Sequence, residues 1–111
     1  MSDYTIGSGD IFADLGLSPA EAEEANVKSG LIQQIADAIE SQGLKQMEAA
    51  ALVGVDQPTL SKVLRGRMDG VSVERLAAWL NKLGYDVTVK VVRKPKAEAG
   101  DRGHFALEVV A

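Results

Sequence analysis

The fold of this chain is decided by the twenty residues from Gln46 to Arg65, which read QMEAAALVGVDQPTLSKVLR. Two short helical patterns flank a glycine in this stretch, and such helices can cross at roughly 90–120° around a tight turn. The crossing needs a small residue in the first helix, which Ala50 supplies. Four residues later the turn needs a positive φ, which Gly54 adopts without steric cost. The stretch therefore predicts a helix-turn-helix.

The positions that would lie between the two helices are apolar on both sides of the turn. They are Ala49, Val53, Val55, Leu60 and Val63. We expect Ala50, Gly54, Val55, Leu60 and Val63 to hold the motif together.

The outer face of the second helix carries side chains that can contact DNA. Its polar residues are Gln57, Thr59, Ser61, Lys62 and Arg65, with Pro58 in the first turn. A glutamine can form two hydrogen bonds with the edge of an adenine. Gln46 begins the first helix, where backbone N–H groups and the helix dipole favour a phosphate. The pattern favours DNA binding over mere helical packing.

The rest of the chain divides into three parts. Residues 1–17 contain several glycines and are expected to form an irregular arm. Ser18, Pro19 and Glu21 are typical of a helix start, with a capping serine and a proline in the first turn. Residues 18–84 are expected to form the helical domain, with Ser72 capping its last helix.

Residues 85–111 are expected to form a C-terminal β appendage. Tyr85–Val92 and His104–Val110 both alternate apolar and polar residues, which is typical of strands. They predict a small hairpin that packs on the helices or pairs with a second subunit, since a lone hairpin is marginal in water. The fold class is therefore mainly α, with about five helices and a hairpin or dimerisation strand.

Composition excludes several classes of function. The chain has 111 residues, no cysteine and a single histidine, so disulfides, thiolate sites and two-histidine zinc sites are excluded. No nucleophile–base pair or metal set is visible, so we expect no enzyme, metal or cofactor. The chain shows neither a secretory signal nor an apolar run that could span a membrane, which favours a soluble, cytoplasmic protein.

The net charge of −4 by itself argues against DNA binding, but it is unevenly distributed. Residues 1–40 contain eight acidic residues and one basic residue, Lys28. Residues 41–111 contain eight acidic and eleven basic residues. The acidity therefore lies ahead of the motif, where Glu21, Glu23 and Glu24 fit either a solvated first turn or a surface for a basic partner.

Residues 44–66 resemble the helix-turn-helix of the Xre/Cro, lambda-repressor-like regulators. Further similarity lies in Asp10–Leu17 (DIFADLGL), Leu60–Arg67 (LSKVLRGR), Arg75-Leu76 and Leu83–Val87 (LGYDV). Together these resemble the HigA-type antitoxins, small proteins of that family encoded beside a RelE/ParE-like toxin. The similarity covers roughly residues 7–92.

The resemblance implies a homodimer that represses its own gene from a palindromic operator on double-stranded DNA. Base contacts would come from Gln57, Thr59, Ser61 and Lys62, and phosphate contacts from Gln46, Arg65 and Arg67. The two reading helices of a dimer would lie about 34–36 Å apart. Two alternatives stay open: a module that neutralises a toxin with little DNA binding, and a stand-alone phage-type repressor. His104 is expected to be an ordinary surface histidine.

Overall fold

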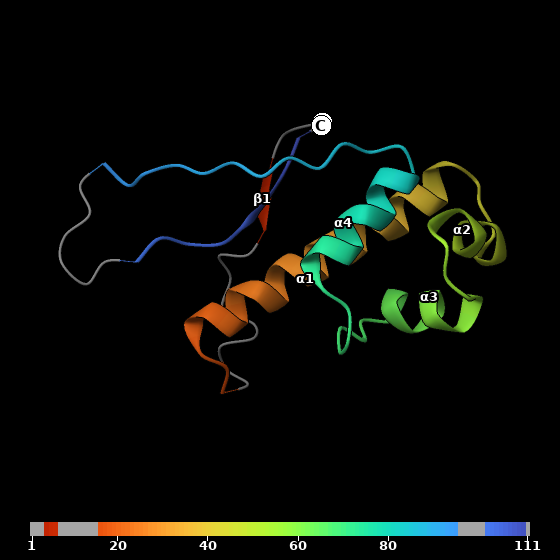
Figure 1. The fold of residues 1–111 in the computed structure, drawn as a ribbon, viewed down its shortest axis with the longest axis horizontal. Helices are drawn as coiled ribbons and strands as arrows, with labels where there is room; N and C mark the ends of the chain where they lie inside the picture. The colour runs from red at the N-terminus through yellow and green to blue at the C-terminus, as the bar shows by residue number, and fades with distance from the viewer. Residues whose placement is uncertain (1–3, 7–15, 96–101, 111) are drawn as a thin grey trace.

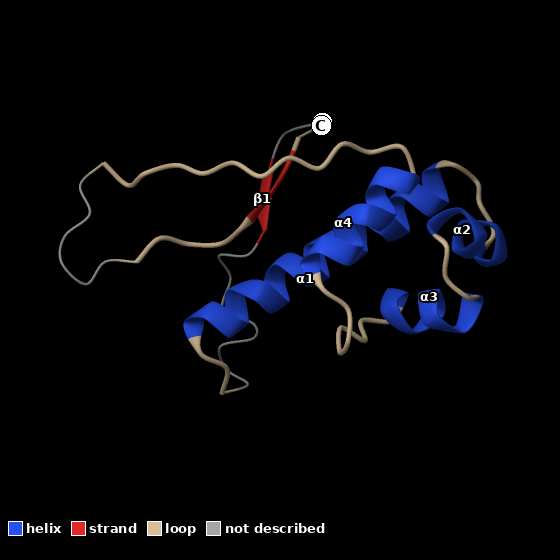
Figure 2. Cartoon of the chain, in the orientation of Figure 1, coloured by secondary structure: helices blue, strands red, loops and turns tan. Residues whose placement is uncertain are grey.

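The computed structural model describes residues 4–6, 16–95 and 102–110. The described chain is mainly helical, as predicted, with four helices where about five were expected (Figures 1 and 2). The helices are α1 (Pro19–Ser41), α2 (Gln46–Val53), α3 (Gln57–Leu64) and α4 (Val73–Lys82). The strands are β1 (Tyr4–Ile6) and β2 (Leu107–Val109).

The start of α1 is the capping box that the sequence predicts. The backbone N–H of Glu21 donates to Ser18 Oγ at 3.2 Å, and the N–H of Ser18 donates to the Glu21 carboxylate at 3.0 Å. Pro19 occupies the first turn, where its missing N–H costs nothing. The helix then runs without a break through Gly30 to Ser41.

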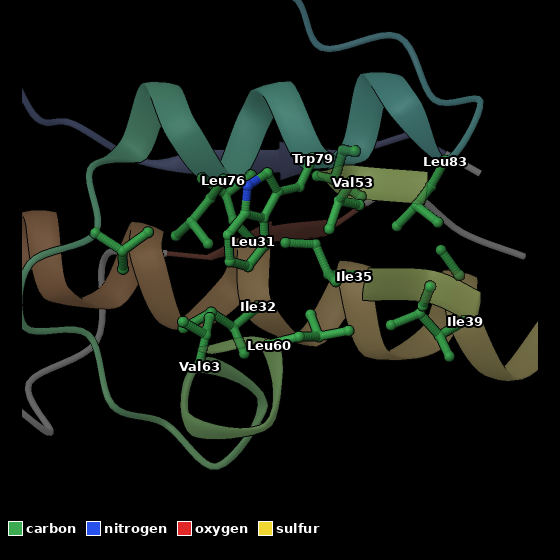
Figure 3. Close-up of a cluster of buried hydrophobic side chains, with 14 of the residues drawn as sticks. Leu31, Ile32, Ile35, Ile39, Val53, Leu60, Val63, Leu76, Trp79 and Leu83 are labelled. Atoms are coloured by element: carbon green, nitrogen blue, oxygen red, sulfur yellow. The ribbon is translucent and has the colours of Figure 1, made fainter. Parts of the chain in front are cut away.

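The core forms where α1 and α4 pack together and α2 and α3 close over one end. Figure 3 shows Leu31 and Ile35 of α1 on the side facing Leu76 and Trp79 of α4, and Ile39 on the side facing Leu83. Val53 of α2 and Leu60 and Val63 of α3 complete the cluster. Ile35, Leu60 and Leu76 are fully buried. Burying one side chain of this size stabilises the fold by about 1.5–3 kcal/mol.

The strands pair across the two ends of the chain, and the predicted hairpin is wrong. β1 and β2 are antiparallel, with Tyr4 opposite Val109 and Ile6 opposite Leu107. β1 therefore comes from the arm that was expected to be irregular. Residues 85–92 are extended but belong to neither described strand. β2 lies against α1, and Leu107 packs on the core.

Glu23 holds the chain just before β2. Its carboxylate accepts hydrogen bonds from Arg102 Nη2 at 2.9 Å and from the N–H of Phe105 at 3.2 Å. His104 Nδ1 lies 2.6 Å from the other carboxylate oxygen. The Glu23 side chain is only 11% exposed. Glu23 is therefore not simply solvated, and His104, although 65% exposed, contacts its carboxylate.

The position of Glu23 explains why the two C-terminal segments separate. The end of α1 lies beside the end of α4, where Gln42 Nε2 donates to the carbonyl of Leu83 at 2.8 Å. Glu23 is about 28 Å away along α1, at 1.5 Å per residue. The chain leaves α4 at one end of α1 and is tied down again at the other, as Figure 1 shows.

No helix in the described residues is both long and apolar enough to cross a bilayer.

Glu23→Gln should release the segment around β2, because the amide lacks the charge that pairs with Arg102 and has one acceptor oxygen where the carboxylate has two. The hydrogen bonds from Arg102, His104 and Phe105 lower the pKa of Glu23 to about 2. A lowered pKa means that the carboxylate stabilises the fold above its ordinary value near 4.5, and that this contribution is lost as the pH falls toward about 2. We expect faster tryptic cleavage after Arg102 in Glu23→Gln at pH 8, and release of the wild-type segment between about pH 4.5 and 2 in hydrogen exchange.

The matched control is Glu24→Gln, one residue along the same helix. Glu24 is exposed and lies 3.6 Å from Lys28 Nζ, and among the described residues it takes no part in anchoring the segment before β2. It should leave cleavage after Arg102 unchanged. Equal cleavage rates in the two variants would contradict the anchoring role of Glu23.

Candidate nucleic-acid interface

The turn between α2 and α3 has the backbone that the sequence predicts. Gly54 ends α2 with φ of 82° in the left-handed region. Its N–H and that of Val55 both donate to the carbonyl of Ala50, at 2.9 and 3.0 Å. Because a side chain at this φ clashes with the backbone, glycine is the residue of lowest cost here.

A lysine from α4 closes the same turn. Lys82 Nζ donates to the carbonyl of Val53 at 3.2 Å, at the end of α2 where a cation also meets the negative end of the helix dipole. A Cβ at Gly54 would lie 3.3 Å from this Nζ. The contact ties the motif to α4, which contributes Leu76, Trp79 and Leu80 to the core.

The first turn of α3 is capped by Asp56, which the sequence argument missed as a cap. The N–H of Thr59 donates to Asp56 Oδ1 at 2.7 Å. The hydrogen bonds from the side chain and the N–H of Thr59 lower the pKa of Asp56. An aspartate directly before a helix with proline in its first turn is the signal that could have identified it.

α3 presents one apolar and one polar face. Leu60 and Val63 are buried in the core. On the outer side Gln57 and Lys62 are exposed, and Thr59 and Ser61 are half-buried. The four residues predicted to contact bases thus lie on one eight-residue helix at the edge of the molecule, on the side remote from β1 (Figure 1).

The residues predicted to contact phosphates lie at helix ends. Arg65 is the C-cap of α3, and Arg67 follows the next glycine; both are exposed. Gln46 is the first residue of α2 and is also exposed. The Glu48 carboxylate accepts a hydrogen bond from the backbone N–H of Lys45 at 2.8 Å, so a negative charge already lies at the start of α2. A phosphate contact there depends on the Gln46 side chain rather than on the helix end alone.

The charges around α3 are therefore asymmetric. Asp56 stands at its N-terminal end, and Lys62, Arg65 and Arg67 lie at or beyond its C-terminal end. Phosphates are attracted to the cationic end and repelled by the carboxylate. Such a surface can hold a duplex in one orientation while the exposed side chains of the first turns contact base edges.

Comparison with known proteins identifies the same region. A family model described as a helix-turn-helix domain matches residues 11–92. A solved structure described as an XRE family transcriptional regulator has a TM-score of 0.68 and 37% sequence identity with this chain. That match covers 81% of this chain and 97% of the other. Among curated proteins, none matches this chain.

Gly54→Ala should lower the free energy of unfolding by about 1 kcal/mol, the approximate cost of a left-handed backbone for a residue with a Cβ. The close contact between the added Cβ and Lys82 Nζ should contribute little to this loss of stability, because the end of a lysine side chain can move. Urea unfolding followed by circular dichroism measures the change.

Gly54→Asn is the matched variant, because asparagine adopts positive φ more readily than alanine while adding a larger side chain. It should lose less stability than Gly54→Ala. The opposite order would show that space beside Lys82, rather than the backbone, decides the residue at this position.

Proposed function

This chain belongs to the helix-turn-helix family of XRE-like transcriptional regulators, and on that premise we propose that it represses transcription from a specific operator. DNA binding through α3 is the core of the proposal. The observation that carries it is the division of α3 into a buried face, Leu60 and Val63, and a solvent face with Gln57 and Lys62.

In the proposed complex α3 enters the major groove. Gln57, Thr59, Ser61 and Lys62 contact bases, and Gln57 is the strongest candidate because its exposed amide can both donate and accept. Gln46, Arg65 and Arg67 contact phosphates on either side of the groove. Promoter occupancy then blocks transcription.

The charge distribution supports specific rather than general binding. The first 40 residues are strongly acidic, and Asp56 places a carboxylate at the start of α3. Weak non-specific attraction for phosphates follows, because the electrostatic part of binding scales with the number of cations on the DNA face. Discrimination then comes from a few side chains on α3.

The finer part of the proposal is that the regulator is a homodimer on a palindromic site and the antitoxin of a toxin–antitoxin pair. The support is the resemblance carried by Leu60–Arg67 and Leu83–Val87. In this role the chain also binds a small basic toxin, and toxin binding alters its affinity for the operator.

The first test is DNA binding, measured by fluorescence anisotropy with the duplex immediately upstream of the gene and with a scrambled duplex of equal composition. Gln57→Ala should reduce the preference for the upstream duplex by about 5- to 150-fold, which corresponds to about 1–3 kcal/mol. Arg65→Ala should weaken binding to both duplexes by the same factor. It should also reduce the slope of log affinity against log salt concentration by about one.

Gln33→Ala is the control for the loss of a glutamine, because Gln33 is exposed on α1, where its side-chain amide donates to Asp37 at 2.9 Å. It should bind both duplexes as the wild type does. If the double variant Gln57→Ala, Lys62→Ala bound the upstream duplex with wild-type affinity and preference, α3 would not be the reading helix.

The second test concerns the toxin. The product of the adjacent reading frame should be a small basic protein that co-purifies with this chain and whose growth inhibition is relieved by co-expression. A gene without such a neighbour, or a neighbour whose toxicity this chain leaves unchanged, would argue against the antitoxin role and leave the DNA-binding proposal intact.

A further inference from the structure

Residues 85–92 form an extended segment with exposed apolar side chains. The segment leaves α4 at Gly84. Val89 is 81% exposed and Val91 is 91% exposed. Within the described part of the chain, the backbone of residues 86–92 forms no hydrogen bond. An extended, apolar segment with open backbone groups is a site at which another strand adds.

The side chains of this segment alternate between two kinds. Tyr85, Val87, Val89 and Val91 lie on one face, and Asp86, Thr88 and Lys90 on the other. If two copies of the segment pair antiparallel, their apolar faces coincide only when opposed residues are an even number of positions apart. A slip of one residue would place valines on the polar face.

Charge then selects among the registers that remain. With Thr88 opposite its own copy, Asp86 lies opposite Lys90 twice, and Val87 lies opposite Val89. Opposite charges and β-branched residues are favourable cross-strand pairs. If Val89 instead lies opposite its own copy at the centre of the pair, Asp86 lies opposite Val92 and has no charged partner.

The remaining shifts are also worse. A centre at Val87 places Asp86 opposite Thr88. A centre at Lys90 places Asp86 opposite Lys94, but it also places two lysines opposite each other in the middle of the pair. Of these four registers, only the one centred on Thr88 places both charged residues of 85–91 opposite an opposite charge.

We propose that a second copy of this chain pairs antiparallel with residues 85–91, on a twofold axis at Thr88. This inference rests on the dimeric regulator proposed above and assigns its interface. In Figure 1 residues 85–95 lie on the side of α1 and α4 remote from α3, so the pairing leaves α3 uncovered. Both α3 helices of the dimer stay accessible to DNA.

Cross-linking tests the register directly, because the chain has no cysteine of its own. Residues directly opposite in an antiparallel pair have Cα atoms about 4.5–5.5 Å apart, within disulfide range. Thr88→Cys should therefore form a covalent dimer under mild oxidation. Lys90→Cys alone should form no covalent dimer, because the two cysteines would be offset by four residues. A mixture of the Asp86→Cys and Lys90→Cys variants should cross-link, because these two positions lie opposite each other.

Charge reversal tests the same pairing in solution. Asp86→Lys and Lys90→Asp each place like charges opposite one another, and each should weaken the dimer by about 10- to 100-fold in sedimentation equilibrium. An equimolar mixture of the two variants should restore association, because each lysine then faces an aspartate. Lys94→Asp is the control, since it makes the same charge change outside the paired residues.

The outcomes separate this inference from the proposed function. A monomer at micromolar concentration, or a dimer that Thr88→Cys does not cross-link, would overturn the interface whatever the DNA result. Protection of residues 85–92 only in the presence of another protein would also overturn it. If the dimer forms the expected cross-link but does not bind the upstream duplex, the interface is supported and the operator-binding function is contradicted.

Discussion

The packing of α4 against α1 is the interaction on which the rest of the structure depends. Ile35 and Leu76 are fully buried in that contact, and every other element lies against one of these two helices. α3 inserts Leu60 into the same core, and α2 is tied to α4 through Lys82. Without the pair, the helix-turn-helix would have no surface on which to bury its inner face, since isolated helices of eight residues are not stable in water.

α1 also separates the two working surfaces. At its C-terminal end Gln42 holds the chain as it leaves α4, and near its N-terminal end Glu23 holds the chain as it returns. The extended segment between these points is kept on the side away from α3 (Figure 1). The same helix thus supports a face suited to DNA and a segment suited to a second copy of the chain, without overlap between them.

Local spacing was sufficient to predict the motif and much of the core. Ala50 and Gly54 lie four residues apart because the turn requires it, and the structure has the φ and the hydrogen bonds that this spacing implies. The cap at Ser18 was equally readable, because both partners lie within four residues. Asp56 carried the same kind of local signal and was missed, although it caps the helix that forms the candidate site.

By itself, the sequence determined the helices, the turn and the polar outer face of α3, because each depends on residues a few positions apart. Only the tertiary structure decided the partners of the strands and the role of Glu23. β2 pairs with β1 across the whole chain, and Glu23 meets His104 more than eighty residues away. Alternation shows that a segment can be a strand but not which strand lies beside it. A carboxylate near the start of a helix is expected to be solvated, and only the fold shows that Arg102 reaches it.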